Sequence, residues 1–558
     1  MQQINYVLAL QQADPAREAR QHSVRQLTAL GVHQTDAVEA LKAAGGDFRQ
    51  AAQALDFDLQ VASRFVRAPI GLPNRSNDCF WLATVQCLRH VPGFAQTVTA
   101  CTERALQRPP LNVAHALANL LLRMERQREA DYLSLRCPEL HDFIRICERN
   151  LPKDDGHALV QSNFQRQEQE DSNEFLNQLL NVLGEYAFQG GQDTGDPGPP
   201  PSRSASSLAV QEHARLRLLA IAEELTEASK EEDWGEVYKL VSEFADIQWD
   251  GSRLRLRSGI GELLEGQRLV VMECSACRRW SAGSADSFIM EEVRVQPKGA
   301  RRGGGSGKVH NSLTSMLRGN TARDTPEGYR CDGCGAADTT AFRDGLRKLP
   351  KVYAVHINRT LPNGSRCSEP VQLEETLDLK DMLLYKQKGP IDHSNQPCAS
   401  SYQLAAVTFH RGVSARSGHY IACVRDMSLG KSPTYRVAKP LKVTVDIAPS
   451  SAEVMQLEPG SSLVCLEERE HVGSGIVRRS TTRMLCQYGW VTPSAGSLAR
   501  TSGWTELDDD EVSECGPGVT PQAIERSRAG ARAAMLFYVR DELEPPEPDP
   551  GDAVGSPD

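Results

Sequence analysis

Hydrophobic periodicity predicts helices early in the chain and strands later. The segment CFWLATVQCL, residues 79–88, is apolar on nearly every side, which predicts a helix that is buried all round. Beyond about residue 348 the pattern changes to short runs rich in β-branched and aromatic residues, separated by turns: KVYAVHI, YQLAAVTFH, HYIACVR and AMLFYVR. We therefore expect an α+β protein whose second half is largely sheet.

Residues 23–55 carry three short helical patterns, separated by Gly31 and by the pair Gly45 and Gly46. Each pattern has one apolar stripe, which is enough for a three-helix bundle near the smallest size that folds unaided. The stripes are Val24, Leu27 and Leu30, then Ala37, Ala40 and Leu41, and then Phe48, Ala51, Ala52 and Leu55. We assign this small bundle to residues 1–60, with its core at 23–57.

A charged helical pattern follows the Gly- and Pro-rich segment 189–207. Its apolar positions recur at helical spacing and predict an inserted helical hairpin: Leu218, Ile221, Ala222 and Leu225, then Trp234, Val237, Tyr238 and Val241. The segments 189–207, 297–308 and 542–558 contain too little apolar surface to offset the entropy of ordering them. We expect insertions near 189–250 and 297–310, and a disordered acidic tail at 542–558.

Composition and charge narrow the class of protein. A chain of 558 residues with 40% hydrophobic and 24% charged content can bury a large core. Its net charge of −10 provides no basic field for nucleic acid or for an anionic membrane surface, so we expect neither as a partner. The first residues lack the pattern of a signal peptide, and no window approaches roughly 18 uncharged apolar residues, which favours the cytoplasm or the nucleus.

Four of the fifteen cysteines form two C-x-x-C motifs, Cys274 and Cys277 in ECSAC and Cys331 and Cys334 in RCDGCG. Two such motifs suit a tetrahedral zinc ion with four thiolate ligands, which leaves no open position for a catalytic water. A thioredoxin-like redox motif is the rival for either pair alone, but two pairs in one sheet-like region argue against it. We expect a structural zinc ion and no catalytic cofactor.

Cys79 begins the apolar helix and is preceded by the turn-forming residues Asn74, Ser76, Asn77 and Asp78. A thiol in the first helical turn lies at the positive end of the helix dipole, where the thiolate is favoured. The preceding residues can cap the helix, and an asparagine on that turn could donate to a developing oxyanion. The alternative is an ordinary buried cysteine, which position alone favours.

A nucleophilic thiol needs a base, and the base needs an orienting partner. Among thirteen histidines, His419 follows a Ser-Gly turn at the start of a β run, and Asp508, Asp509 and Asp510 follow a short apolar segment. The order cysteine, histidine, acid is that of papain-like cysteine proteases. Each residue also has a simpler interpretation: His419 could be a structural histidine, and the run of aspartates could be a solvated turn.

Longer segments make the pattern specific. GLPNRSNDCFWLATVQCL resembles the cysteine box of the ubiquitin-specific protease (ubiquitin carboxyl-terminal hydrolase) family, and SYQLAAVTFHRGVSARSGHYIACVR resembles its histidine box. Five further segments resemble other parts of the family in the same order: QEDSNEFLNQLL, LLEGQRLVVMECSAC, LRKLPKVYAVHINR, GWTELDDDEV and AMLFYVR. The resemblance implies a papain-like catalytic domain of fingers, palm and thumb over residues 68–541, with a zinc ribbon in the fingers and a further insertion near 427–500.

The resemblance also implies roles for individual residues. It makes Cys79 the nucleophile, His419 the general base and Asp508 the residue that orients the imidazole, with Asp509 as an assisting second acid. Asn74 matches the oxyanion-hole donor. The implied activity is that of a deubiquitinating cysteine peptidase that cleaves after the C-terminal glycine of ubiquitin through a thioester acyl-enzyme, with ubiquitin and ubiquitinated proteins as partners.

The N-terminal bundle resembles a ubiquitin-associated domain, with LGV at residues 30–32 in the loop that contacts ubiquitin in that family. In the cysteine box, Ser76 and Asp78 replace the glycine and threonine that are usual. Asp78 is a good helix cap, but its charge opposes formation of the neighbouring thiolate. A catalytically weak or inactive ubiquitin-binding scaffold of the same fold is therefore the second hypothesis, and a zinc-stabilised adaptor unrelated to ubiquitin is the third.

Overall fold

The chain forms two compact units. The computed structural model describes residues 34–45, 50–51, 70–95, 97–98, 113–126, 132–151, 170–189, 205–256, 259–297, 311–321, 323–361, 365–384, 391, 396–414, 417–425, 427, 434–445, 447–449, 452–472, 480–486, 489–527 and 531–541. Unit 1 comprises Met1–Arg75, Leu122–Cys137 and Ile421–Ser527, and unit 2 comprises Ser76–Leu121, Pro138–Tyr420 and Arg528–Asp558. The division falls within strand β10 (Ser417–Arg425), whose residues belong to both units.

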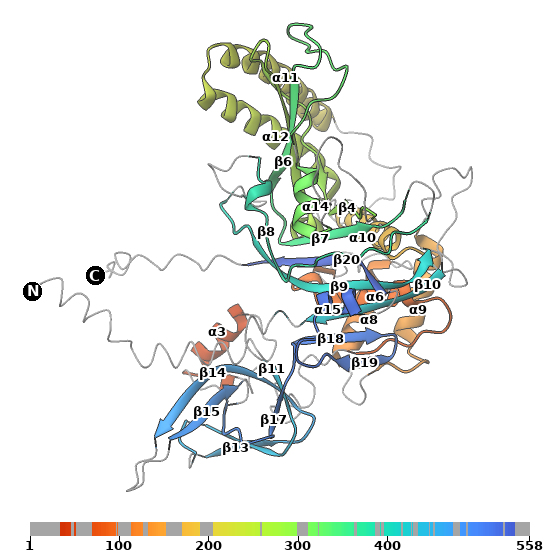
Figure 1. Cartoon of the computed structure of the whole chain (residues 1–558), viewed down its shortest axis with the longest axis vertical. Coiled ribbons are helices and arrows are strands. Elements are labelled where there is room, and N and C mark those ends of the chain that lie inside the picture. The colour runs from red at the N-terminus through yellow and green to blue at the C-terminus, as the bar shows by residue number, and fades with distance from the viewer. Residues whose placement is uncertain are drawn as a thin grey trace, which may run out of the picture. The chain divides into compact units, whose positions relative to one another are not determined.

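In unit 2 the apolar segment that begins at Cys79 forms helix α6, which packs against helix α10 (Figure 1). Residues 79–88 of helix α6 are all buried, as the apolar pattern predicts. Phe80 and Trp81 contact Phe175 of α10, at ring-centroid distances of 6.0 and 4.6 Å. The helices are α6 (Cys79–Arg89), α8 (Val113–Arg126, shared with unit 1), α9 (Pro138–Asn150), α10 (Ser172–Gln189), α11 (Ala205–Lys230), α12 (Trp234–Leu256), α13 (Gly259–Leu264), α14 (Leu313–Asn320) and the 3-10 helix η1 (Lys380–Met382).

A five-stranded sheet in unit 2 carries the helical hairpin formed by α11 and α12. Its order is β2-β1-β6-β5, with β3 paired to β1, and the long antiparallel pair β1 and β6 places Cys274 opposite Thr340. Buried side chains of both helices share a core with Val271 and Trp280 of the sheet, as the two helices beside the strands in Figure 1 indicate. The strands are β1 (Gly266–Cys274), β2 (Trp280–Ala282), β3 (Ser287–Phe288), β5 (Arg323–Asp324) and β6 (Thr340–Lys348).

The remaining strands of unit 2 form the sheet on which α6 packs. Strands β9 (Ser401–Ser414), β20 (Ala531–Arg540), β7 (Val352–Asn358) and β4 (Met290–Arg294) lie side by side in that order, and β8 (Thr376–Asp378) pairs with β9. The central strands are apolar on both faces, since consecutive residues such as Tyr353, Ala354 and Val355 are all buried. The β runs predicted beyond residue 348 lie in β7, β9, β10 and β20.

Unit 1 contains a strand pair and a separate seven-stranded sheet. Strand β18 (Trp504–Asp508) pairs with residues 422–425 of β10 and with β19 (Glu511–Glu514). The sheet has the order β13-β12-β16-β15-β14-β11-β17. Its strands are β11 (Thr434–Val437), β12 (Leu441–Thr444), β13 (Glu453–Leu457), β14 (Ser462–Val472), β15 (Ser480–Cys486), β16 (Gly489–Val491) and β17 (Leu498–Arg500), and helix α15 (Pro521–Ser527) follows β19.

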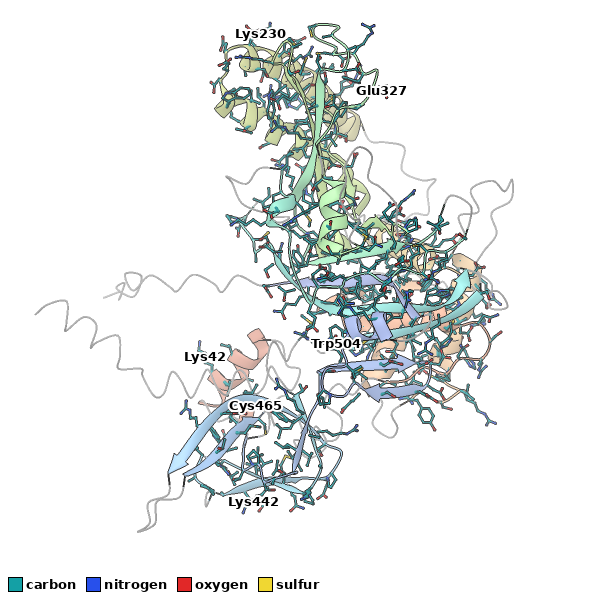
Figure 2. All side chains as sticks on the ribbon, in the orientation of Figure 1. Lys42, Lys230, Glu327, Lys442, Cys465 and Trp504 are labelled. Atoms are coloured by element: carbon teal, nitrogen blue, oxygen red, sulfur yellow. The ribbon has the colours of Figure 1, made fainter. Side chains whose placement is uncertain are left out.

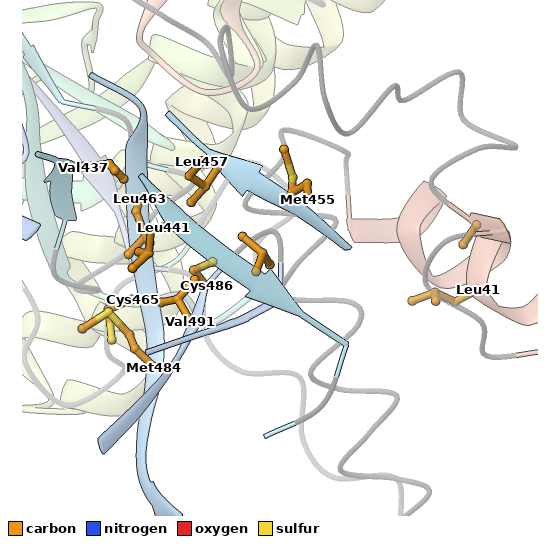
Figure 3. Close-up of a cluster of buried hydrophobic side chains, with 12 residues drawn as sticks. Leu41, Val437, Leu441, Met455, Leu457, Leu463, Cys465, Met484, Cys486 and Val491 are labelled. Atoms are coloured by element: carbon orange, nitrogen blue, oxygen red, sulfur yellow. The ribbon is translucent and has the colours of Figure 1, made fainter. Parts of the chain in front are cut away.

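The apolar side of this sheet shares a core with the N-terminal part of the chain. Leu41, on helix α3 (Gln34–Ala43), and Ala51 belong to the same buried cluster as Val443, Met455 and Leu457 (Figure 3). Helix α3 falls on the second of the three helices predicted for the N-terminal bundle. The first predicted helix and the segment 30–32 lie outside the described residues, as does the tail 542–558.

The mixed α+β composition predicted from the sequence is confirmed by the two units. Long helices occur, but none of the helices in the described ranges combines the length and the apolar character needed to cross a membrane.

Replacement of Phe175 by alanine should destabilise unit 2, because Phe175 is fully buried between two aromatic rings of α6. Phenylalanine-to-alanine changes in a core cost about 3–5 kcal/mol, so a thermal unfolding measurement should show a clearly lower midpoint. Asn177→Ala, at an exposed position of the same helix, is the control and should change stability by less than about 0.5 kcal/mol. Equal midpoints for the two variants would contradict this packing.

Candidate functional site

Cys79 is the first residue of α6 and is only 3% exposed. The preceding Asp78 is fully buried at the N-cap position, and its backbone carbonyl accepts hydrogen bonds from the amides of Trp81 and Leu82, at 3.0 and 3.1 Å. Its carboxylate makes no capping hydrogen bond, so the cap expected from the sequence is wrong. The reason lies in the backbone: φ −76° and ψ −8° are helical values, whereas a capping side chain needs an extended residue to reach the next amides.

The loop before Cys79 is hydrogen-bonded to the turn after β18, within unit 1. The Asn74 side-chain amide donates to the Asp509 carboxylate at 3.0 Å, and the Leu72 backbone amide donates to the Asp509 carbonyl at 2.8 Å. Gly71 allows this approach, because a Cβ there would lie 2.3 Å from the carbonyl oxygen of Asp510. Two of the residues predicted for the site, Asn74 and Asp509, are therefore brought together.

The contact between Asn74 and Asp509 has a chemical consequence for the amide. An asparagine side chain has two N–H donors, and the bond to Asp509 uses one of them and fixes the orientation of the group. Sequence reasoning had named both residues but not their contact, since no local signal links positions that are 435 residues apart.

His419 is half-buried on β10, directly after a close approach of two backbone segments in unit 2. Gly418 has φ +150°, and a Cβ on it would lie 2.0 Å from the carbonyl oxygen of Arg411 on β9. Ser417 and Gly418 lie within β10 rather than in the turn expected from the sequence, and this close approach requires a glycine at position 418. It fixes the backbone that carries the imidazole.

Strand β9 places a second histidine near His419. His410 is fully buried, and its ring centroid lies 4.4 Å from that of Tyr420, the residue after His419. Neither ring nitrogen of His410 has a hydrogen-bond partner among the described residues. The sequence placed His410 in the histidine box without a role, and its burial indicates that it packs against Tyr420 as an aromatic side chain.

Asp508 is the last residue of β18 and is half-buried. In unit 1 the pairing of β18 with β10 sets Leu507 opposite Ala422 and Trp504 opposite Arg425, whose guanidinium lies 5.8 Å from the Trp504 ring centroid. The backbone register on one side of Asp508 is therefore fixed.

The four cysteines of the two C-x-x-C motifs form one cluster in unit 2. Their sulfur atoms lie within 4.8 Å of one another, with 3.9 Å between Cys274 and Cys334 and 3.7 Å between Cys277 and Cys331. These distances are too long for disulfides. Four sulfurs about 2.3 Å from one ion would be about 3.8 Å apart in a tetrahedron, so the cluster fits a four-coordinate metal ion. Glu327, on the loop that leads to the third cysteine, is labelled in Figure 2.

The pKa values within the cluster shift in opposite directions. Burial raises the pKa of the Cys274 thiol, but hydrogen bonds from Thr339 and from the backbone amides of Cys277 and Ala276 outweigh it and lower the pKa to about 6. Burial and the neighbouring thiols raise the pKa of Cys277 to about 12. Without a cation the negative charge is thus unevenly distributed, whereas a bound cation favours the thiolate form of every ligand.

Comparison with known proteins identifies the family. Residues 70–538 match the sequence model described as ubiquitin carboxyl-terminal hydrolase. Ubiquitin carboxyl-terminal hydrolase 48 of Danio rerio is 27% identical over 176 residues, which are 31% of this chain and 15% of that protein. Ubiquitin carboxyl-terminal hydrolase 26 of Oryza sativa subsp. japonica is 28% identical over 180 residues, 31% of this chain and 15% of that protein. The chain therefore matches only a small part of the length of these curated relatives.

Among solved structures, the SAGA Ubp8 deubiquitinase module bound to monoubiquitin is 13% identical, with a TM-score of 0.49, and the match covers 89% of this chain and 76% of that chain. The family match rests on the sequence, since it extends over most of the 558 residues. The resemblance inferred from the cysteine and histidine boxes is thereby confirmed: the chain belongs to the ubiquitin carboxyl-terminal hydrolase family, a family of cysteine-type deubiquitinases.

Proposed function

We propose that this protein is a deubiquitinating cysteine peptidase, which hydrolyses the peptide or isopeptide bond after the C-terminal glycine of ubiquitin. The observation that carries the proposal is the hydrogen bond from Asn74 to Asp509, because it orients an amide donor five residues before the cysteine of the cysteine box. Membership of the family supplies the substrate class.

Cys79 is the proposed nucleophile. It lies at the N-terminus of α6, where the helix dipole favours the thiolate. Attack of its sulfur on the carbonyl carbon of the ubiquitin glycine gives a tetrahedral oxyanion, and expulsion of the amine leaves a thioester. The side-chain amide of Asn74 is the proposed donor to that oxyanion, and the bond to Asp509 orients it.

His419 is the proposed general base, with Asp508 as its orienting acid. Because Leu507 pairs with Ala422, continuing the antiparallel register by one residue sets Asp508 opposite Ile421. Side chains alternate along a strand, so His419 and Ile421 lie on the same face of β10. His419 protonates the leaving amine and then activates the water that hydrolyses the thioester. Asp509, whose carboxylate accepts from Asn74, is proposed to assist as a second acid.

We further propose that the partners are ubiquitin and ubiquitinated proteins, met in the cytoplasm or the nucleus. None of the described cysteines forms a disulfide, as is usual in a reducing compartment. The cluster of Cys274, Cys277, Cys331 and Cys334 is proposed to hold a structural zinc ion, because four thiolates fill its coordination shell.

A ubiquitin-binding scaffold without turnover is the second candidate. The observation that favours it is the burial of Asp78, a carboxylate with no exposed surface that directly precedes the nucleophile. A carboxylate at this position repels a second negative charge on the adjacent residue. The first two predictions below separate the two candidates.

Ubiquitin that carries an electrophile at its C-terminus should form a covalent adduct with the wild-type protein and none with Cys79→Ala, as measured by intact mass. Cys87→Ala, a buried cysteine on the same helix, is the control and should still form the adduct. His419→Ala should abolish turnover of a fluorogenic ubiquitin substrate and leave ubiquitin affinity unchanged. Wild-type protein that binds ubiquitin but forms no adduct would favour the scaffold.

Asp78→Thr should accelerate acylation, because it removes a like charge from beside the thiolate. Two such charges about 5 Å apart repel by roughly 1–3 kcal/mol, so a rise of about tenfold in kcat/KM is expected. Asp78→Asn keeps the size of the side chain and should give a similar rise. If both variants are as slow as wild type or slower, the electrostatic argument fails.

Cys331→Ser should release the bound zinc and lower the thermal midpoint, because a structural site loses one of its four ligands. Metal content measured by mass spectrometry should fall from about one zinc per chain to near zero. Cys367→Ser, at a buried cysteine outside the cluster, is the control and should retain the metal. Wild-type protein without zinc would reject the assignment.

A further inference from the structure

The seven-stranded sheet is inserted in the chain between the strand that carries His419 and the strand that ends at Asp508. Its first and last strands pair with each other, with Tyr435 opposite Arg500 and Val437 opposite Leu498. The base of the sheet is thus one closed pair, from which β10 and β18 continue.

Side-chain contacts connect this base, formed by β11 and β17, to β18 and β19 and to the residues beside them. The hydroxyls of Thr434 and Thr501 lie 2.6 Å apart, and Arg436 on β11 forms an ion pair with Glu514 on β19 at 3.3 Å. The Ser502 hydroxyl donates to the carbonyl of Cys515 at 3.0 Å. A displacement of the sheet base would therefore be transmitted to the strand pair.

The part of the sheet that lies away from this base, at β13, is covered by the chain's own N-terminal segment. Leu41 is 4% exposed and Ala51 fully buried in the cluster that includes Met455 and Leu457 of β13. Figure 3 shows Leu41 at the side of the cluster where β13 carries Met455. The same cluster extends to Val437 at the sheet base, so one apolar core joins α3 to β11.

The composition of α3 suits close packing on a sheet. Ala40 on the helix and Ala44 just after its end pack against the same cluster as Leu41, so small side chains flank the one large anchor. Lys42, labelled in Figure 2, is exposed on the same helix. Helix α3 is thus amphipathic, and its apolar face is already occupied.

From these contacts we propose that the seven-stranded sheet is an intramolecular docking surface for helix α3, and that this docking holds β10 and β18 in the pairing that the reaction requires. The second part rests on the proposed function, whereas the first does not. The partner that the surface fits is a short amphipathic helix with one leucine between alanines, supplied by the same chain.

Hydrogen exchange of the full-length protein tests the docking. Leu41→Asp should accelerate amide exchange in residues 441–457 at least tenfold, because the sheet loses its apolar cover. Lys42→Asp introduces the same carboxylate at the exposed neighbour and should leave that exchange unchanged. From the other side, Val454→Asp on β13 should accelerate exchange in residues 34–43, whereas Lys442→Ala, at an exposed position of β12, should not. Unchanged exchange in both segments would overturn the docking.

Steady-state hydrolysis of a fluorogenic ubiquitin substrate tests the coupling. Leu41→Asp should lower kcat at least threefold and leave KM within twofold, and Lys42→Asp should change neither. Accelerated exchange with an unaltered kcat would overturn the coupling and leave the docking supported. If the wild-type protein hydrolyses no substrate, the proposed function and with it the coupling fail, and the exchange experiment still decides the docking.

Discussion

The proposed active site depends on two hydrogen bonds between distant parts of the chain. Asp509 accepts one from the backbone amide of Leu72 and one from the side-chain amide of Asn74. Asp509 adopts a left-handed backbone conformation, with φ 56°, which turns its carbonyl and its carboxylate toward the same loop. Gly71 makes these bonds sterically possible, because its lack of a side chain lets the loop contact the backbone of Asp510. Along the chain, the loop leads directly into α6, which begins with Cys79.

Much of the candidate site could be predicted because its signals are local. The apolar run after Cys79 indicates a buried helix, the run HYIACVR that begins at His419 indicates a strand, and two C-x-x-C motifs indicate a four-sulfur cluster. In each case the residues that interact are close in sequence, or each motif supplies two ligands on one turn. Thr339, whose hydroxyl lies 3.3 Å from the Cys274 sulfur, is a contact that no such motif reveals.

Other features depend on backbone geometry or on partners that no short pattern specifies. Capping preference suggested that Asp78 caps α6, but capping requires an extended ψ, and this loop gives Asp78 a helical one. The stripe at Ala37, Ala40 and Leu41 identifies the apolar face of a helix. It does not identify the surface that covers that face, which here is a sheet more than 390 residues later in the chain. Periodicity selects a face, and tertiary structure selects its partner.

A flexible insertion of about 75 residues between the proposed base and its proposed orienting acid would add a loop-closure entropy cost to the pairing of their strands, although that cost grows only slowly with loop length. The pairing of β11 with β17 removes this cost by closing the insertion at its own base. The bond from the Thr501 amide to the Thr434 carbonyl, 2.9 Å, then keeps the two ends of the insertion at the spacing of paired strands. Because the insertion is folded, it reinforces the pairing of β10 with β18, and whatever stabilises the inserted sheet stabilises that pairing as well.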